Sequence, residues 1–327
     1  MKIIVDAFGG DNAPKAMIEG CMMAVKEYGA SILLCGDEEK IKACAKEHNF
    51  SLHNIEIVHS PGVMDVHTDP TEILKSDTSM AEGLRRLAKG EGDAFVSAGS
   101  TGALLVGGTL IVKRIKGIKR PALSPVMPTA DKPYLLIDCG ANLDVRPEML
   151  VQFGIMGSVY MNKVLGCETP RVGLLNVGAE DTKGGEMLVE TYGLLKNSPV
   201  NFVGNIEARE VPEGACDVLV TDGFSGNIVL KLTEGVAGSF MGMIKKIFKR
   251  NWITKFAAML IMPGLKALKK QMDYTEYGGA PLLGTARPVI KAHGSSNAKA
   301  FKNAIRQAIQ FSETGVIEEI EAIVNTK

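Results

Sequence analysis

The sequence lacks an excess of charge of either sign. Its 37 Lys and Arg residues are balanced by 37 Asp and Glu residues, so the formal net charge is zero. With 46% hydrophobic and 23% charged residues, the composition is that of an ordinary globular protein. These values exclude a disordered chain, a collagen-like chain and a uniformly basic nucleic-acid-binding protein. Aromatic residues are scarce at 6% beside 36 glycines, which suits tight turns better than an all-β sandwich.

Cysteine pairs and long apolar runs are also missing. The six cysteines form no Cys-x-x-Cys pair and join no cluster with zinc spacing, which is typical of a reducing compartment. The first apolar run meets Asp6 too early for a signal peptide. The longest apolar stretch without a charge, between Lys255 and Lys266, is too short to span a bilayer. We therefore expect a cytoplasmic protein, for which a contact with a membrane surface stays open.

Apolar runs alternate with helical patterns along the chain. Strands are predicted at 2–6, 31–35, 55–59, 93–97, 122–127, 134–138, 171–177, 200–204, 217–221 and 288–292. Helices are predicted at 13–28, 38–47, 78–89, 101–114, 147–165, 185–196, 226–249, 252–270, 296–311 and 313–324. The alternation predicts an α/β protein with a mostly parallel sheet covered on both faces. The four prolines of 121–134 are a candidate boundary between subdomains.

Six of the predicted strands end in polar, glycine-rich turns that open helices, at 6–12, 97–102, 138–142, 176–185, 221–227 and 291–297. Ligands of open α/β sheets bind beyond the carboxyl ends of the strands, where helix N-termini and glycine-rich backbone favour anions. Six such turns on one edge predict a cleft for an anion such as phosphate, although any single turn could merely connect a strand to a helix. The candidate phosphate or substrate-binding residues are Asp6, Gly9, Gly10, Asp11, Asn12, Ser97, Ser100, Thr101, Gly102, Asp138, Asn142, Gly226, His293, Ser295 and Ser296.

Three common catalytic signatures are missing: the dinucleotide motif G-x-G-x-x-G, the P-loop and the G-x-S-x-G elbow. Individual side chains in the turns each allow two interpretations. Lys183 opposes the dipole of the helix that it precedes, so it is either a solvated lysine or a cation for phosphate or a developing oxyanion. Asn227 is a helix cap or an oxyanion donor. His293 binds phosphate or a turn carbonyl.

Eight stretches between residue 4 and about residue 300 follow one another in a specific order: VDAFGGDNAP, SAGSTGALL, LIDCGAN, GLLNVGAEDTKG, FVGNIEAR, TDGFSGNIVLK, DYTEYGGAPLLG and VIKAHGSSNAKA. Together they resemble the bacterial phosphate acyltransferase family of phospholipid synthesis. The resemblance implies a modified Rossmann-like α/β/α sandwich, similar to isocitrate-dehydrogenase-type and phosphotransacetylase folds. It also implies a single catalytic domain over 1–327 that forms a homodimer and needs no cofactor or metal.

The same resemblance implies an activity and its residues. Family members transfer a long-chain acyl group from acyl carrier protein to inorganic phosphate, and the acyl phosphate feeds a membrane glycerol-3-phosphate acyltransferase. Lys183 and Asn227 match the family's catalytic lysine and asparagine. The chain departs from the family at Gly185 and Ser100, where asparagine is usual. Ser100 retains a hydroxyl for phosphate, whereas Gly185 has no side chain that could bind it.

The segment 240–272 is expected to form a protruding amphipathic arm. Between Glu234 and Asp273 there are eight Lys or Arg residues and no acid, so the rest of the chain has 29 basic against 37 acidic residues. Apolar side chains recur there at helical spacing, and Pro263 with Gly264 predicts a break into two short helices. The apolar face either packs in the core or a dimer interface, or rests on anionic lipid while the lysines meet an acidic carrier. The candidate contact residues are Trp252, Phe256, Leu260, Ile261, Leu265, Lys266 and Lys269.

Other functions stay open on the residues alone. An NAD(P)-dependent decarboxylating dehydrogenase fits the fold, but Asp138 and Asp222 belong to no D-x-x-x-D pair that would mark a metal site. A phosphotransacetylase acting on acetyl-CoA is a second alternative, and a non-enzymatic binder of phosphate or acyl phosphate is a third. Nucleic acid is not an expected partner, because no aromatic residues are interleaved with the basic ones.

Overall fold

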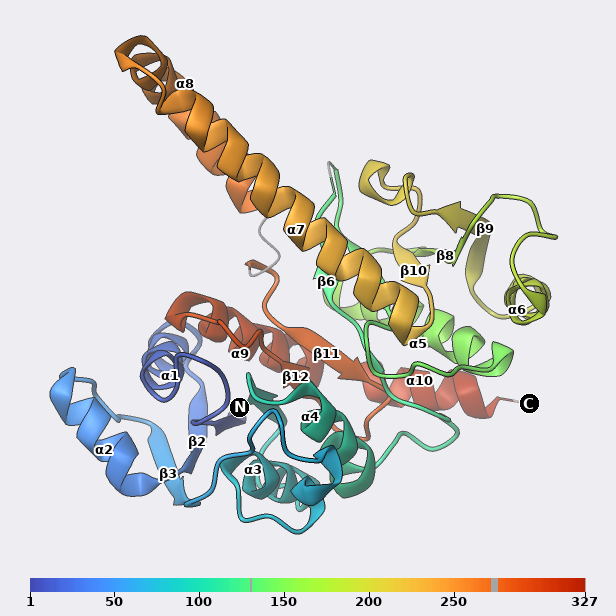
Figure 1. Ribbon diagram of the computed structural model, residues 1–327. Helices are drawn as coiled ribbons and strands as arrows, with labels where there is room; N and C mark the ends of the chain where they lie inside the picture. Colours follow the sequence, from blue (N-terminus) through green and yellow to red (C-terminus); the bar gives the residue numbers. More distant parts are fainter. Residues whose placement is uncertain (130, 272–275, 327) are drawn as a thin grey trace.

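A computed structural model describes residues 1–129, 131–271 and 276–326, with residues 266–271 described by their backbone alone. The strands of the described residues gather in two sheets (Figure 1). The first sheet contains, in spatial order, β3 (Ile55–His59), β2 (Ser31–Gly36), β1 (Lys2–Asp6), β4 (Ala94–Ser97), β12 (Val289–Lys291), β11 (Ala280–Leu283) and β5 (Ala122–Leu123). The second contains β6 (Val126–Met127), β7 (Tyr134–Ile137), β10 (Val218–Val220), β8 (Arg171–Asn176) and β9 (Asn201–Glu207). Both sheets are parallel except at β5, β6 and β11, so the predicted mostly parallel arrangement is confirmed.

Side chains of the first sheet alternate between two helical layers, as the pleat requires. Ile3 and Val5 pack in the cluster that includes α1 and α9, whereas Ile4 packs in the cluster that includes α3 and α4. Both faces of the first sheet are therefore buried under helices, which explains why its strand sequences are apolar throughout. The helices around this sheet are α1 (Lys15–Tyr28), α2 (Glu38–Glu47), α3 (Ser79–Ala88), α4 (Thr101–Gly107) and α9 (Ala298–Glu313), with a 3-10 turn at Pro70–Leu74 and a π-helical turn at Gly108–Val112.

The second sheet is covered in the same way. Leu135 and Val220 face α5 (Pro147–Leu165), while Leu136 and Leu219 face the start of α7 (Gly223–Phe248). The remaining helices are α6 (Glu186–Lys196), α8 (Trp252–Gln271) and α10 (Val316–Asn325), with a 3-10 turn at Val211–Glu213. One hydrophobic cluster runs through both sheets. Tyr160 of α5 lies within it, accepts a hydrogen bond from Gln307 of α9 at 3.0 Å and meets the edge of Phe311.

The proline-rich segment crosses from one sheet to the other. A single strand was expected over 122–127, but β5 joins the first sheet and β6 joins the second. The prediction was wrong because Ser124 and Pro125 separate two pairs of residues that bond to different neighbours, and an apolar pattern cannot show which neighbour a strand has. The helix expected over 101–114 is wrong in part, since its last turns are π-helical and end at Val112. The strand β11, which lies between β12 and β5, was not predicted at all.

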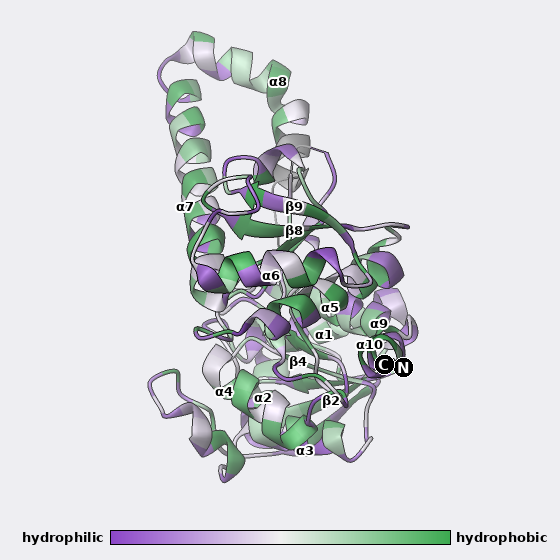
Figure 2. Ribbon diagram, turned by 90° about the vertical axis from the view of Figure 1, so that its right-hand side faces the viewer, coloured by the Kyte–Doolittle hydropathy of each residue, from purple (hydrophilic) through white to green (hydrophobic). Residues whose placement is uncertain are grey.

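The first turns of α7 pack against the second sheet, whereas its later turns and α8 project away from both sheets (Figure 1). The two helices stand apart from each other in the view of Figure 2. α8 continues through Pro263, so the predicted break into two short helices is wrong. A proline inside a helix removes one backbone hydrogen bond, but here the helix is exposed and water can take the place of the lost donor. The expected extents of the catalytic domain, 1–327, and of the arm, 240–272, stay predictions. Among the described residues, no helix is both long and apolar enough to cross a membrane.

Candidate active site

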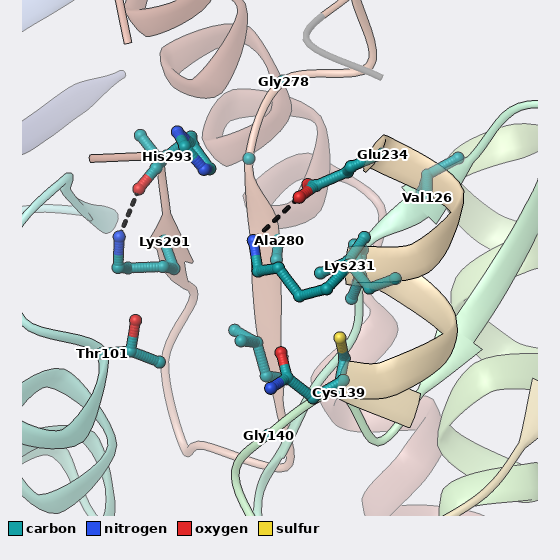
Figure 3. Close-up of a pocket in the computed structure, with 16 residues that line it drawn as sticks. Thr101, Val126, Cys139, Gly140, Lys231, Glu234, Gly278, Ala280, Lys291 and His293 are labelled. Carbon is teal, nitrogen blue, oxygen red and sulfur yellow. Dashed lines mark hydrogen bonds and ion pairs between the residues drawn. The ribbon is translucent and has the colours of Figure 1, made fainter. Parts of the chain in front are cut away.

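A cavity of about 310 Å³ lies where residues of the two sheets meet (Figure 3). One side is formed by Thr101 at the start of α4 and by Lys291 and His293 at the end of β12. The other side is formed by Cys139 and Gly140 after β7 and by the face of α7. Its lining residues are Thr101, Leu123, Pro125, Val126, Cys139, Gly140, Asn227, Leu230, Lys231, Glu234, Gly278, Gly279, Ala280, Lys291, Ala292 and His293.

The glycine-rich turns lie on two sheet edges, so the prediction of a single edge is wrong. The turns after β1, β4 and β12 belong to the first sheet, and those after β7, β8 and β10 belong to the second. An alternating sequence pattern cannot reveal this division, because both sheets are built mainly from parallel strands. Residues of four turns line the cavity, while none from 6–12 or 176–185 does so.

Asp6 and Ser97 hold the first turn together. The buried carboxylate of Asp6 accepts hydrogen bonds from the hydroxyls of Ser79 and Ser97, each at 2.6 Å, and from the backbone of Phe8. Burial raises the pKa of Asp6, and the two serine bonds lower it. Direct phosphate binding by Asp6 stays a prediction. In this structure its carboxylate oxygens accept hydrogen bonds from protein donors, and the residue supports the turn.

Gly9 and Gly10 have backbone reasons to be glycine. A Cβ on Gly9 would lie 2.5 Å from Oδ2 of Asp6 and 2.6 Å from the backbone nitrogen of Gly99. Gly10 has a φ of +96°, and the next residue, Asp11, donates its N–H to the carbonyl of Gly294 at 2.8 Å. The turn after β1 is thereby fixed against the turn after β12.

Asp138 plays the corresponding part in the second sheet. Its carboxylate accepts from the backbone of Leu123 at 2.8 Å, Cys139 at 2.7 Å and Asn142 at 2.6 Å, and from the Asn142 amide at 3.0 Å. Burial raises the pKa of Asp138 to about 6, and these donors lower it. Asn142 also donates to the carbonyl of Pro121. The phosphate contacts of Asp138 and Asn142 stay a prediction, and in this structure both side chains make bonds that connect the two sheets.

The turn after β12 is held by Asn12. The amide of Asn12 donates to the carbonyls of Ser295 and Ser296, each at 3.2 Å. Within the turn, Nδ1 of His293 lies 2.8 Å from the hydroxyl of Ser295. Burial lowers the pKa of His293, and the charge of Lys231 lowers it further. His293 lines the cavity, Ser295 is exposed beside it, and Ser296 is buried behind it.

The turn after β4 presents one side chain to the cavity. The Ser100 hydroxyl caps α4 by accepting from the backbone of Ala103 at 3.4 Å, and Gly102 packs against Pro70. Thr101, between them, lines the cavity and is exposed. Of the residues predicted to bind phosphate, Thr101 and His293 therefore line the cavity.

Asn227 lies one turn inside α7. The helix begins at Gly223, and Asp222 caps it by accepting from the backbone of Ser225 at 2.9 Å. The alternative that Asn227 is an ordinary cap is therefore wrong, and the residue lines the cavity. Gly226 permits this approach, because a Cβ there would lie 1.9 Å from the carbonyl oxygen of Asp138.

Lys183 lies outside the cavity lining. Its ammonium is 3.8 Å from the Glu180 carboxylate, and its side chain is about half exposed. Two buried asparagines hold the surrounding turn: Asn176 donates to the carbonyl of Lys183 at 3.0 Å, and Asn205 donates to that of Glu180 at 2.7 Å. Gly185 caps α6 without a side chain, and a Cβ added there would meet none of the described residues within 4 Å.

Sequence reasoning missed two cations in the cavity, Lys231 and Lys291. Lys231 follows Asn227 by four residues, so both lie on one face of α7, and it pairs with Glu234 at 2.8 Å. Lys291 ends a buried strand, and because lysine is rarely buried without a partner, a lysine at such a position is a candidate functional residue. The i, i+4 spacing on α7 and the lysine at the strand end were the signals that could have identified them.

The comparisons with known proteins decide the family. A family profile described as "Fatty acid synthesis protein" matches residues 1–319. A phosphate acyltransferase from Alkaliphilus oremlandii is 48% identical over 328 residues, which cover 100% of this chain and 98% of that relative. One from Bacillus licheniformis is 48% identical over 331 residues, covering 100% and 99%. The chain belongs to the phosphate acyltransferase family.

Membership of the phosphate acyltransferase family makes the chain an acyltransferase of fatty acid and lipid synthesis. Its fold is similar to a phosphotransacetylase from Streptococcus pyogenes, with a TM-score of 0.66 at 16% identity over 95% of this chain and 94% of that one. A 4-hydroxythreonine-4-phosphate dehydrogenase from Klebsiella pneumoniae gives 0.54 at 13% identity over 96% and 99%. The predicted likeness to phosphotransacetylase folds is confirmed. Because this dehydrogenase has a similar fold, the fold alone does not exclude the dehydrogenase alternative. Membership of the phosphate acyltransferase family is what argues against it.

Proposed function

We propose that this phosphate acyltransferase moves a long-chain acyl group from acyl carrier protein to inorganic phosphate and releases acyl phosphate for phospholipid synthesis. The observation that carries the proposal is the composition of the cavity. Asn227, Lys231 and Lys291 supply donors and positive charge, and Leu123 with Leu230 supplies an apolar wall. An anionic nucleophile and an apolar acyl thioester need these two environments side by side.

The reaction needs no covalent intermediate with the protein. An oxygen of hydrogen phosphate attacks the thioester carbonyl carbon, and the carbonyl oxygen becomes an oxyanion. The oxyanion collapses, the carbon–sulfur bond breaks, and the thiolate of the carrier's pantetheine arm leaves. The thiolate gains the proton that the phosphate gives up, so the products are acyl phosphate and a free thiol.

Asn227 and Lys183 are the proposed oxyanion donors. Asn227 lines the cavity. Lys183 lies on the turn after β8, and β8 is the direct neighbour of β10, the strand that leads into α7 and Asn227. A donor aimed at the developing oxyanion contributes on the order of 10²–10³ in turnover. Thr101 and His293 are proposed to contact the phosphate.

The proposed partners are a second copy of the chain, acyl carrier protein, an anionic membrane surface and a membrane glycerol-3-phosphate acyltransferase. The support is the arm, where Trp252, Phe256, Leu260 and Ile261 are all exposed and Leu265 is half-buried. The alternative that this face packs in the core of its own chain is wrong for these residues. The side chains of Lys266 and Lys269 lie outside the described residues. We place the protein in the cytoplasm at the inner face of the cell membrane.

The test traps the product with hydroxylamine. Purified protein is mixed with palmitoyl carrier protein over a range of phosphate concentrations, and acyl hydroxamate and free carrier thiol are measured. We expect phosphate-dependent hydroxamate with a matching release of thiol. Lys183→Ala and Asn227→Ala should each lower kcat by about 10²–10³. The matched variants Lys196→Ala and Asn197→Ala, at the far end of α6, should retain the wild-type rate.

Two results would contradict the proposal. Near-wild-type turnover in Lys183→Ala or Asn227→Ala would remove the assigned role of that residue. Absence of hydroxamate with palmitoyl carrier protein, together with product from acetyl-CoA, would assign the chain to the phosphotransacetylase alternative.

A further inference from the structure

The cavity carries an excess of positive charge. Among its lining residues, which are all described, Lys231, Lys291 and His293 are the basic side chains and Glu234 is the acidic one. A cavity that holds two lysine ammonium groups against one carboxylate favours an anionic ligand. The position of each ammonium group indicates which anion.

Lys291 is a fixed cation. Its ammonium donates to the carbonyl of Ala98 at 3.3 Å and to that of Ala292 at 2.5 Å, and the side chain is half-buried. A lysine has three N–H donors, so these neutral acceptors leave one for a ligand. Within the described residues Lys291 has no carboxylate at ion-pair distance, and its charge is therefore not neutralised by contact.

Lys231 is an adjustable cation on the opposite wall (Figure 3). It pairs with Glu234, which lies three residues further along α7, at 2.8 Å. More than half of the Lys231 side chain is exposed, so the ammonium can exchange Glu234 for another anion at little cost. Asn227 precedes it by one helical turn and faces the same cavity.

We propose that Lys291 and Lys231 bind the inorganic phosphate from opposite walls of the cavity, and that Glu234 holds Lys231 while the site is empty. The inference rests on the proposed function, because it places the nucleophile of that reaction. A phosphate dianion carries the charge that two ammonium groups neutralise. The phosphodiester of a pantetheine arm carries a single negative charge and fits the pair less well. Phosphate at this position lies on the face of α7 that presents the oxyanion donor Asn227.

The test measures phosphate binding without an acyl donor. The full chain and its variants are titrated with inorganic phosphate and followed by ³¹P NMR. Lys291→Met and Lys231→Met should each raise the dissociation constant for phosphate by about 10- to 100-fold, which is the effect of losing one charge-assisted hydrogen bond. Glu234→Gln should lower the dissociation constant for phosphate, because the Glu234 carboxylate no longer competes with phosphate for Lys231.

The matched control is Lys163→Met. Lys163 pairs with Glu319 at 2.7 Å, as Lys231 pairs with Glu234, but lies outside the cavity. Phosphate affinity should not change in this variant. Thermal unfolding checks whether Lys291→Met is folded. If it is not, phosphate binding by Lys231→Met decides the test, because the Lys231 side chain is more than half exposed and its replacement should not unfold the protein.

Two outcomes would overturn the inference. Unchanged phosphate affinity in folded Lys231→Met and Lys291→Met would do so directly. A raised KM for acyl carrier protein with unchanged phosphate affinity would assign the two lysines to the pantetheine phosphodiester. Failure of the proposed function looks different, since wild-type protein would then bind phosphate through these lysines and form no acyl phosphate.

Discussion

The side-chain amide of Asn205 donates a hydrogen bond to the main-chain carbonyl of Glu180 at 2.7 Å, across 25 residues of sequence. Asn205 is buried in β9, and Glu180 lies in the exposed turn that carries Lys183. Asn176 holds the other end of the same turn through the carbonyl of Lys183. The side-chain amides of Asn176 in β8 and Asn205 in β9 thus fix a turn that is itself exposed to solvent.

Asn205→Ala should therefore lower kcat without changing the fold of the sheet. The variant removes the bond to Glu180 and leaves Lys183 in place but less well held. Because a displacement of about 1 Å can cost about 10²-fold in rate, we expect kcat to fall by about 10- to 100-fold while the KM for phosphate stays within about twofold. The hydroxamate assay measures both.

A double mutant separates positioning from a structural role. If Asn205 acts through Lys183, then Lys183→Ala/Asn205→Ala should be no slower than Lys183→Ala alone. Additive losses would argue against positioning. Asn197→Ala is the matched control, because that amide also bonds to a backbone carbonyl, that of Gly193 at 2.8 Å, but on the far end of α6.

Gly226 of α7 leaves no room for a side chain against the turn that follows β7. A Cβ at this position would lie 1.9 Å from the carbonyl oxygen of Asp138, which is backbone and cannot turn away. Gly226→Ala should lower the free energy of unfolding by about 3 kcal/mol or more, the upper end of overpacking costs. Gly193→Ala, in a helix with open space around it, should instead raise stability by roughly 0.5–1 kcal/mol. Urea unfolding of both variants checks the pair, and equal stability of the two would contradict the contact.

The sequence predicted the elements of the fold but not their division into two sheets. Strands such as IIVD and VLV are apolar throughout, and this pattern requires burial on both faces wherever the strand lies. Which strands become neighbours depends on pairing across many residues. Two-residue strands such as β5 and β6 carry too few side chains to indicate it.

The candidate site was predictable as a set of turns but not as a set of contacts. The two candidate carboxylates at the strand ends, Asp6 and Asp138, are buried, and they accept hydrogen bonds that fix the turns around them. Lys231 was missed because a lysine within a long basic helix resembles a solvated charge. Lys291 was missed because the polar turn that follows it is the stronger signal in the sequence.

Phosphate affinity should decrease as the pH rises through about 8. Burial lowers the pKa of Lys291 to about 8, the carboxylates of Asp6 and Asp11 raise it, and Lys231 lowers it. The ammonium is charged below this pH and binds the anion, and the neutral amine above it does not. Lys291→Arg retains its charge over this range, so it should lose the decrease between pH 7 and pH 9. Phosphate titration by ³¹P NMR at both values provides the check, and an identical decrease in the arginine variant would assign the titration to another group.

The exposed apolar face of the arm should bind anionic lipid through Leu260. Leu260 is 69% exposed on α8, and Trp252 and Phe256, also exposed, precede it at intervals of four residues on the same helix, whose ribbon in Figure 2 carries hydrophobic and hydrophilic residues. An apolar face flanked by lysines gains energy both from burial in the acyl boundary and from attraction to anionic headgroups. Wild-type protein should therefore float with phosphatidylglycerol vesicles, less so at high salt, and Leu260→Glu should stay in the soluble fraction.

Leu143→Glu, with a side chain that is 68% exposed but lies outside the arm, should float like wild type. If Leu260→Glu floats unchanged, the arm does not bind lipid, and a shift of that variant from dimer to monomer in sedimentation would show that a second copy covers the face.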